Sequence, residues 1–128
     1  SSYNLYENLE IPNFMIFPGS ETKLLKGLEL GCSGIISATC NVTAPLARKV
    51  FDDFLNKEKQ TFNEKLCAIR AVFDKNDLIT GLHSFMSFKN EKYKVVLPPL
   101  SLLSKEKEKE MMSELESLDF FPEKNIAA

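Results

Sequence analysis

The 128-residue sequence contains no tryptophan, one histidine, two arginines and three cysteines. Long hydrophobic runs are also missing: the longest uninterrupted apolar stretches, 14–17 and 95–100, are far shorter than the roughly 20 residues that a membrane-spanning helix needs. A net charge of −2 with so little arginine offers no clustered basic face for nucleic acid. We therefore expect a protein that binds neither a membrane nor nucleic acid.

The cysteines, Cys32, Cys40 and Cys67, are odd in number and have no Cys-x-x-Cys spacing. Such residues are typical of reduced, partly buried thiols, so we expect a cytoplasmic protein. The acidic residues show no spacing typical of metal ligands, and we expect no metal and no other cofactor. The single histidine, His83, falls within a predicted helix and is interpreted as structural.

The N-terminal part reads as a strand, a helix and a second strand. Ten phenylalanines and 44% hydrophobic residues supply a core, which excludes disorder. The apolar run 14–17, closed by Pro18 and Gly19, predicts a strand buried on both faces. Ser20 is placed to cap a helix over 21–30 that Gly31 ends, and 34–38 predicts the second strand. This order indicates a βαβ unit of a parallel sheet.

The remainder of the sequence has helical periodicity. A helix is predicted from residue 44 with Pro45 near its first turn, followed by helices over 62–73, 79–88 and 104–118, the last capped by Ser104. A short stretch at 4–10 also has helical character. Two strands cannot complete a parallel sheet, and the sequence begins Ser1-Ser2 without methionine. We therefore expect the C-terminal half of a larger protein, poorly soluble when produced alone.

Three segments occur in a recognisable order: FMIFPGSE at 14–21, GCSGIISATCN at 31–41, and Ala44-Pro45. They resemble the family of pyruvate-dependent Schiff-base lyases that includes dihydrodipicolinate synthase, N-acetylneuraminate lyase and the 2-keto-3-deoxy-sugar-acid aldolases. The resemblance implies an α/β fold, the C-terminal part of a (β/α)8 TIM barrel followed by a C-terminal helical domain. Strands seven and eight of the barrel, with their helices, then occupy residues 1–57, and the helical region occupies 58–128.

The resemblance further implies a class I lyase or aldolase that forms a Schiff base between a lysine and pyruvate. Ser1-Ser2 is similar to the pair that follows the family's Schiff-base lysine, so that lysine is expected before Ser1 and none of the catalytic groups within the sequence. The implied assembly is a homo-oligomer, most simply a tetramer, and the implied ligands are pyruvate and an aldehyde.

Four residues are implied to bind substrate: Gly19, Glu21, Ile36 and Ser37. Ile36 corresponds to the position whose backbone carbonyl faces the protonated imine, and Gly19 allows backbone to approach a ligand closely. Glu21 is expected to face the part of the substrate beyond the pyruvyl carbons. Glu21 and Ile36 also have structural explanations that need no substrate. Glu21 suits a helix start capped by Ser20, and Ile36 suits any buried strand.

The sequence does not decide between two related reactions of this family, which differ in their substrates. The first expectation is a 4-hydroxy-tetrahydrodipicolinate synthase, which joins pyruvate to aspartate semialdehyde in lysine biosynthesis. The alternative is a 2-keto-3-deoxy-sugar-acid aldolase, favoured by the Pro98-Pro99 segment. Ala38 replaces a serine of the sialic acid lyases and counts against a nine-carbon sugar substrate. From a different class, four successive amphipathic helices would also suit a non-enzymatic interaction module.

Overall fold

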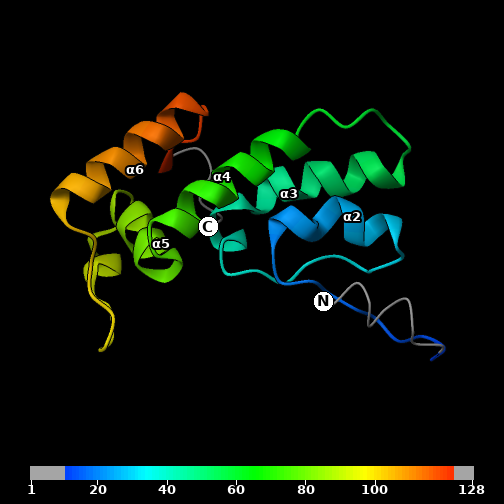
Figure 1. Ribbon diagram of the computed structural model, residues 1–128, viewed down its shortest axis with the longest axis horizontal. Coiled ribbons are helices and arrows are strands. Elements are labelled where there is room, and N and C mark those ends of the chain that lie inside the picture. Colours follow the sequence, from blue (N-terminus) through cyan, green and yellow to red (C-terminus); the bar gives the residue numbers. More distant parts are fainter. Residues whose placement is uncertain (1–10, 123–128) are drawn as a thin grey trace.

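The computed structural model describes residues 11–122, which form a helical assembly in which two helices, α3 and α4, run through the middle (Figure 1). Ser1-Ser2 and the predicted helical stretch at 4–10 lie outside the described residues. The elements in chain order are η1 (Glu21–Lys23), α2 (Leu24–Glu29), α3 (Cys40–Leu55), α4 (Asn63–Lys75), α5 (Leu78–Ser87), η2 (Glu91–Lys94) and α6 (Lys105–Ser117).

The segments expected as strands, 14–17 and 34–38, are extended but form no regular strand in the described part of the chain. Residues 16–18 and 33–36, which overlap these segments, run in the same direction and are joined by hydrogen bonds from Ser33 N to Ile16 O (3.0 Å) and from Ile36 N to Pro18 O (3.1 Å). Pro18 has no N–H to continue a ladder. Residues 11–122 do not bury both faces of these segments, because Met15 is 66% exposed and Ile36 is 73% exposed.

The helix limits agree with the capping residues named from the sequence. Ser20 Oγ accepts a hydrogen bond from the Thr22 amide (3.3 Å), and Ser104 Oγ accepts one from the Lys107 amide (3.3 Å). Gly31 follows α2 with a φ of 92°, a left-handed conformation that glycine adopts without a steric penalty. These features confirm the predicted N-terminal caps and the glycine stop.

Helix α3 begins at Cys40, several residues before the predicted start, and Pro45 lies inside it rather than in its first turn. Thr39 and Thr43 explain the early start. They are one helical turn apart, and both hydroxyls donate to the carboxylate of Glu21. Forming the turn at residues 39–43 therefore brings two donors to one buried acceptor, which outweighs the backbone hydrogen bond that Pro45 cannot make.

The core consists of two hydrophobic clusters that share α3 and α4. In Figure 1, α2 lies along α3 at one end, and α5 and α6 pack near α4 at the other. The buried residues of the first cluster are Leu24, Leu28, Ala47, Val50 and Leu66. Those of the second are Val42, Ile69, Val72, Phe73, Leu82, Phe85, Met111, Leu115 and Phe120. The domain division at residue 57 stays a prediction.

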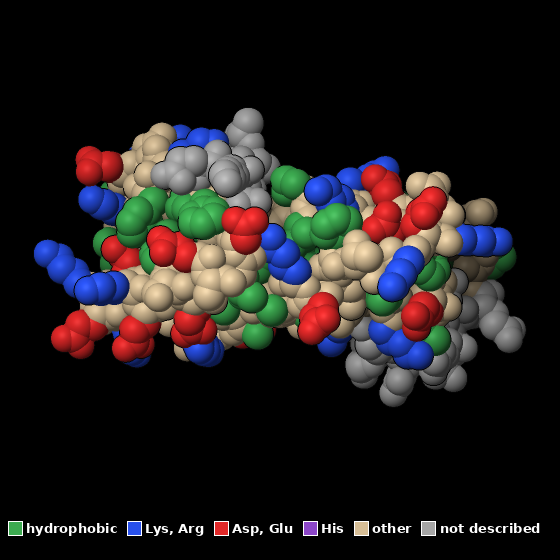
Figure 2. Space-filling view, turned by 90° about the horizontal axis from the view of Figure 1, so that it is seen from above, with side chains coloured by type: hydrophobic (Ala, Val, Ile, Leu, Met, Phe, Trp, Pro, Cys, Tyr) green, Lys and Arg blue, Asp and Glu red, His purple; other side chains and the backbone are tan. Residues whose placement is uncertain are grey.

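The surface carries mixed charge. On the face shown in Figure 2, basic and acidic side chains are interspersed over both ends of the molecule. Among the helices of residues 11–122, none combines the length and the apolar character that crossing a bilayer requires.

We predict that Phe85→Ala lowers the free energy of unfolding of the intact protein by about 3–5 kcal/mol, because it opens a cavity in the second cluster. Phe85 is fully buried, in an edge-to-face contact with Phe73 (centroids 5.6 Å apart) and stacked on Phe120 (5.2 Å). Phe88, which is 52% exposed, provides the matched control, and Phe88→Ala should cost less than about 1 kcal/mol. Equal losses in urea denaturation would contradict this packing.

Candidate functional site

The ends of the two extended segments lie side by side. Gly19 follows the first segment, and an added Cβ at this position would lie 3.8 Å from the backbone oxygen of Ile36. Both residues are exposed within the described region, and the Ile36 carbonyl oxygen lies beside the Gly19 backbone. Two sequence-predicted site residues are therefore neighbours through backbone atoms.

Directly behind them, the Glu21 carboxylate is fully buried at the start of η1. Its Oε1 accepts hydrogen bonds from the hydroxyls of Thr39 and Thr43 (2.8 Å for Thr43). Its Oε2 accepts from Ser37 Oγ (2.9 Å) and from Arg70 Nη1 (2.8 Å). A carboxylate has about four acceptor positions, and these four donors account for them.

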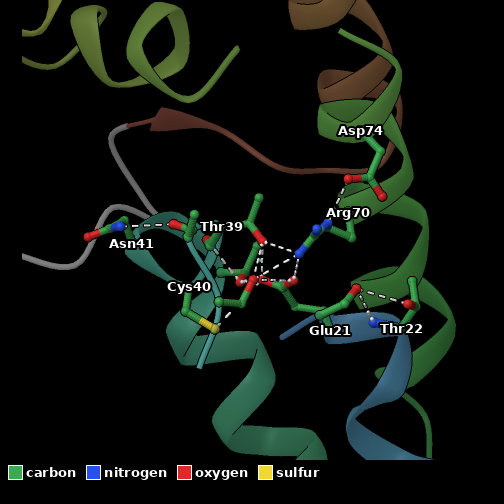
Figure 3. Close-up of polar contacts among 11 residues, drawn as sticks. Glu21, Thr22, Thr39, Cys40, Asn41, Arg70 and Asp74 are labelled. Carbon is green, nitrogen blue, oxygen red and sulfur yellow. Dashed lines mark hydrogen bonds and ion pairs between the residues drawn. The ribbon is translucent and has the colours of Figure 1, made fainter. Parts of the chain in front are cut away.

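Arg70 on α4 supplies the positive charge of the site (Figure 3). It lies 49 residues along the chain from Glu21, and its side chain is 11% exposed. The same Nη1 also lies 2.8 Å from Ser37 Oγ and 3.1 Å from Thr39 Oγ1, while Nε donates to Asp74 Oδ1 (2.9 Å). The guanidinium therefore joins α4 to η1 and to the segment before α3.

Sequence reasoning missed Arg70, although a signal was present. Arg70 is one of two arginines and falls among the apolar positions Leu66, Ile69 and Phe73 of a predicted helix. An arginine on the buried side of a helix requires an acidic partner. The sequence alone does not say which of 18 acidic residues provides it.

The network keeps Glu21 ionised. Burial alone would raise the pKa of the Glu21 carboxyl, but hydrogen bonds from Thr39, Arg70 and Thr43 outweigh burial and hold this pKa below its usual value. Glu21 in turn acts on Cys40, whose Sγ lies 3.6 Å from Oε1. Burial, together with the neighbouring negative charge of Glu21, raises the pKa of the Cys40 thiol to about 11. Cys40 is therefore a neutral thiol at physiological pH.

The four predicted substrate-binding residues thus occupy two layers. Gly19 and Ile36 lie at the surface, whereas Glu21 is enclosed and Ser37 is half-buried between them and Arg70. Contact between substrate and any of the four stays a prediction. His83 lies on α5 and its Nδ1 is hydrogen-bonded to the backbone oxygen of Tyr93 (2.8 Å). Within residues 11–122, no cluster of His, Cys, Asp or Glu has the geometry of a metal site.

Comparison with known proteins assigns the class. The model of the dihydrodipicolinate synthetase family matches residues 3–118, so the chain belongs to this family, and the resemblance noted in the sequence is confirmed. Two N-acetylneuraminate lyases of Actinobacillus pleuropneumoniae, from serotype 5b (strain L20) and serotype 7 (strain AP76), are each 37% identical over 71 residues. The match covers 56% of this chain and 22% of each relative.

The fold is shared with a solved member of the family. The N-acetylneuraminate lyase of Proteus mirabilis superposes with a TM-score of 0.79 at 19% identity, over 94% of this chain and 43% of that one. This chain therefore spans less than half the length of the relatives that it matches.

We predict that Arg70→Met lowers the free energy of unfolding of the intact protein at pH 7 by about 3–5 kcal/mol, because it leaves the Glu21 carboxylate buried without its counter-ion. The double variant Glu21→Gln/Arg70→Met should lose less than Arg70→Met alone, since no charge remains to be desolvated. Arg48 provides the control: it also pairs with an aspartate four residues on (Asp52, 3.0 Å), but its side chain is 69% exposed. Arg48→Met should cost at most about 1 kcal/mol.

The pH dependence follows from the lowered pKa of Glu21. Its contribution to wild-type stability is fully present above the unfolded-state pKa of about 4.5 and is lost as the pH falls through the lower folded-state pKa. Without Arg70 the pKa of Glu21 moves up, so the variant can protonate this carboxyl while folded. The difference between wild type and Arg70→Met should therefore shrink from pH 7 to pH 4. A difference that is constant over this range would show that Glu21 and Arg70 are not coupled.

We also predict that Glu21→Gln lowers the pKa of the Cys40 thiol from about 11, because the neighbouring negative charge is removed while burial remains. The measurement is the rate of iodoacetamide alkylation against pH, in a background in which Cys32 and Cys67 are alanine. Glu29→Gln, at an exposed position on α2, is the control and should leave the rate profile unchanged. An identical profile for Glu21→Gln and wild type would contradict the proximity of Glu21 and Cys40.

Proposed function

We propose that this chain is the C-terminal portion of a (β/α)8 barrel lyase that forms a Schiff base between pyruvate and a lysine preceding Ser1. The observation that carries this proposal is the proximity of Gly19 to the Ile36 carbonyl at the ends of two parallel extended segments, in a chain that belongs to the dihydrodipicolinate synthetase family. In barrel enzymes the active site lies at the C-terminal ends of the strands.

The chemistry of a backbone carbonyl suits this reaction. The lysine amine attacks the C2 carbonyl of pyruvate, water leaves, and the product is a protonated imine, which is a cation. The negative end of the Ile36 carbonyl dipole would stabilise that cation without a proton of its own to lose. Because Gly19 has no side chain, it leaves room for the ligand beside this oxygen.

Glu21 and Ser37 act behind this surface in the proposal. With four internal donors around its carboxylate, Glu21 has no acceptor position left for a substrate hydroxyl. Its part is to hold Ser37 and Thr39 in place, and the substrate-facing groups are the Ile36 carbonyl and the Gly19 backbone. In this proposal Glu21 has mainly a structural role at the helix start and does not contact the substrate directly.

The substrate is proposed to be a sugar-derived keto acid, which is cleaved to pyruvate and an aldehyde, rather than the pair of pyruvate and aspartate semialdehyde. The relatives at 37% identity are named N-acetylneuraminate lyases, which favours sugar-acid chemistry over lysine biosynthesis. Ala38 in place of a serine favours a shorter substrate such as 2-keto-3-deoxygluconate over the nine-carbon sugar. Turnover of the intact protein with these three candidate substrates distinguishes them.

Borohydride trapping tests the reaction class. We predict that the intact protein, treated with borohydride in the presence of pyruvate, gains one covalent adduct by mass spectrometry. The imine forms with loss of water, and hydride then reduces its C=N bond to a stable secondary amine. Peptide mapping should place the adduct on a lysine that precedes Ser1.

Lactate in place of pyruvate is the chemical control, because it has no carbonyl group with which an amine can condense. An adduct with pyruvate and none with lactate supports the lyase. If pyruvate gives no adduct either, the lyase proposal fails and a non-enzymatic interaction module becomes the better explanation of the four helices.

A further inference from the structure

We infer that Arg70 is a positioning residue for the Ile36 carbonyl, which it orients through Ser37 and Thr39. This inference rests on the proposed function, in which that carbonyl faces the imine. It extends the site to α4, an element that lies outside the two extended segments and their connecting helix.

Arg70 contacts the residues that directly follow the Ile36 carbonyl in the chain. The carbonyl of Ile36 belongs to the peptide group that joins Ile36 to Ser37, so anchoring Ser37 anchors that carbonyl. Arg70 Nη1 lies 2.8 Å from Ser37 Oγ and 3.1 Å from Thr39 Oγ1. A single guanidinium nitrogen therefore holds both hydroxyls that immediately follow the proposed imine-facing carbonyl.

Polar contacts, and not packing among the described residues, hold the backbone of Ile36. Ile36 is 73% exposed within residues 11–122, so no packing among these residues orients its backbone. On its N-terminal side, the Ile36 amide donates to Pro18 O (3.1 Å). On its C-terminal side, Ser37 Oγ is held by Arg70 and by Glu21 Oε2 (2.9 Å). The peptide group is fixed between these two sets of polar contacts.

The guanidinium of Arg70 makes contacts in two directions. Arg70 contacts Asp74 through Nε (2.9 Å) and the Glu21–Ser37–Thr39 group through Nη1, so two separate nitrogens act in two directions. Lysine carries one ammonium nitrogen on a flexible stem and cannot reproduce this fork. Arg70→Lys therefore keeps the positive charge but loses the orientation.

The experiment measures pyruvate trapping by borohydride in the intact protein as a function of pyruvate concentration. Ser37→Ala and Arg70→Lys should each raise the half-saturating pyruvate concentration by about ten- to a hundredfold, the equivalent of one hydrogen bond to a charged group. The double variant should be little worse than the worse single variant, because both substitutions remove the same anchor. Arg48→Lys, on the exposed face of α3, is the matched control and should keep the wild-type value.

The half-saturating concentration separates positioning from folding. A purely structural role would reduce the fraction of folded protein, and with it the amplitude of trapping, while the folded fraction kept the wild-type half-saturation. Ser37→Ala removes one hydroxyl and leaves the Glu21–Arg70 pair, so it tests the inference if Arg70→Lys fails to fold. Wild-type half-saturation in both variants would overturn the inference, whereas a wild type that traps no pyruvate would overturn the proposed function itself.

Discussion

The buried ion pair between Glu21 and Arg70 is the interaction on which the arrangement of this chain depends. It joins three regions that are distant in sequence: the start of η1, the residues that lead into α3, and the middle of α4. The helices that follow or contain these regions, α2, α3 and α4, contribute apolar side chains to the two hydrophobic clusters, but burial is non-directional. The hydrogen-bond geometry around one carboxylate sets the register in which these regions meet.

Such a pair carries a cost that the surrounding hydroxyls offset. Removing two charges from water costs several kcal/mol per ion, and the attraction between them repays this only when the remaining hydrogen-bonding capacity is filled. Thr39, Thr43 and Ser37 fill it on the side of Glu21, and Asp74 does so on the side of Arg70. Replacing any one of these short side chains by an apolar one would therefore be felt through the whole network.

Local sequence patterns predicted most of the helical structure. They did not predict the contacts between residues that are distant in the sequence. The periodic segments became α4, α5 and α6 close to their expected limits, because propensity and capping act within one or two turns. The early start of α3 depends on Glu21, 18 and 22 residues before the threonines that bind it. The extended segments lack regular pairing because a ladder requires partners, which no run of apolar residues supplies by itself. In the candidate site, Gly19, Glu21, Ile36 and Ser37 were predicted from the resemblance, and their contact with substrate stays a prediction. Arg70 was not predicted.

The 49-residue separation of Glu21 from Arg70 also has a kinetic consequence. Closing a loop of this length costs about 3 kcal/mol of chain entropy beyond a constant term, whereas a helix such as α4 forms from neighbours within about a microsecond. The ion pair should therefore close late, after α3 and α4 have already shortened the path between its ends. The hydroxyls of Thr39 and Thr43 and the guanidinium of Arg70 are then desolvated in the same step. The amides around residue 39 would therefore gain their hydrogen-exchange protection in that final cooperative step.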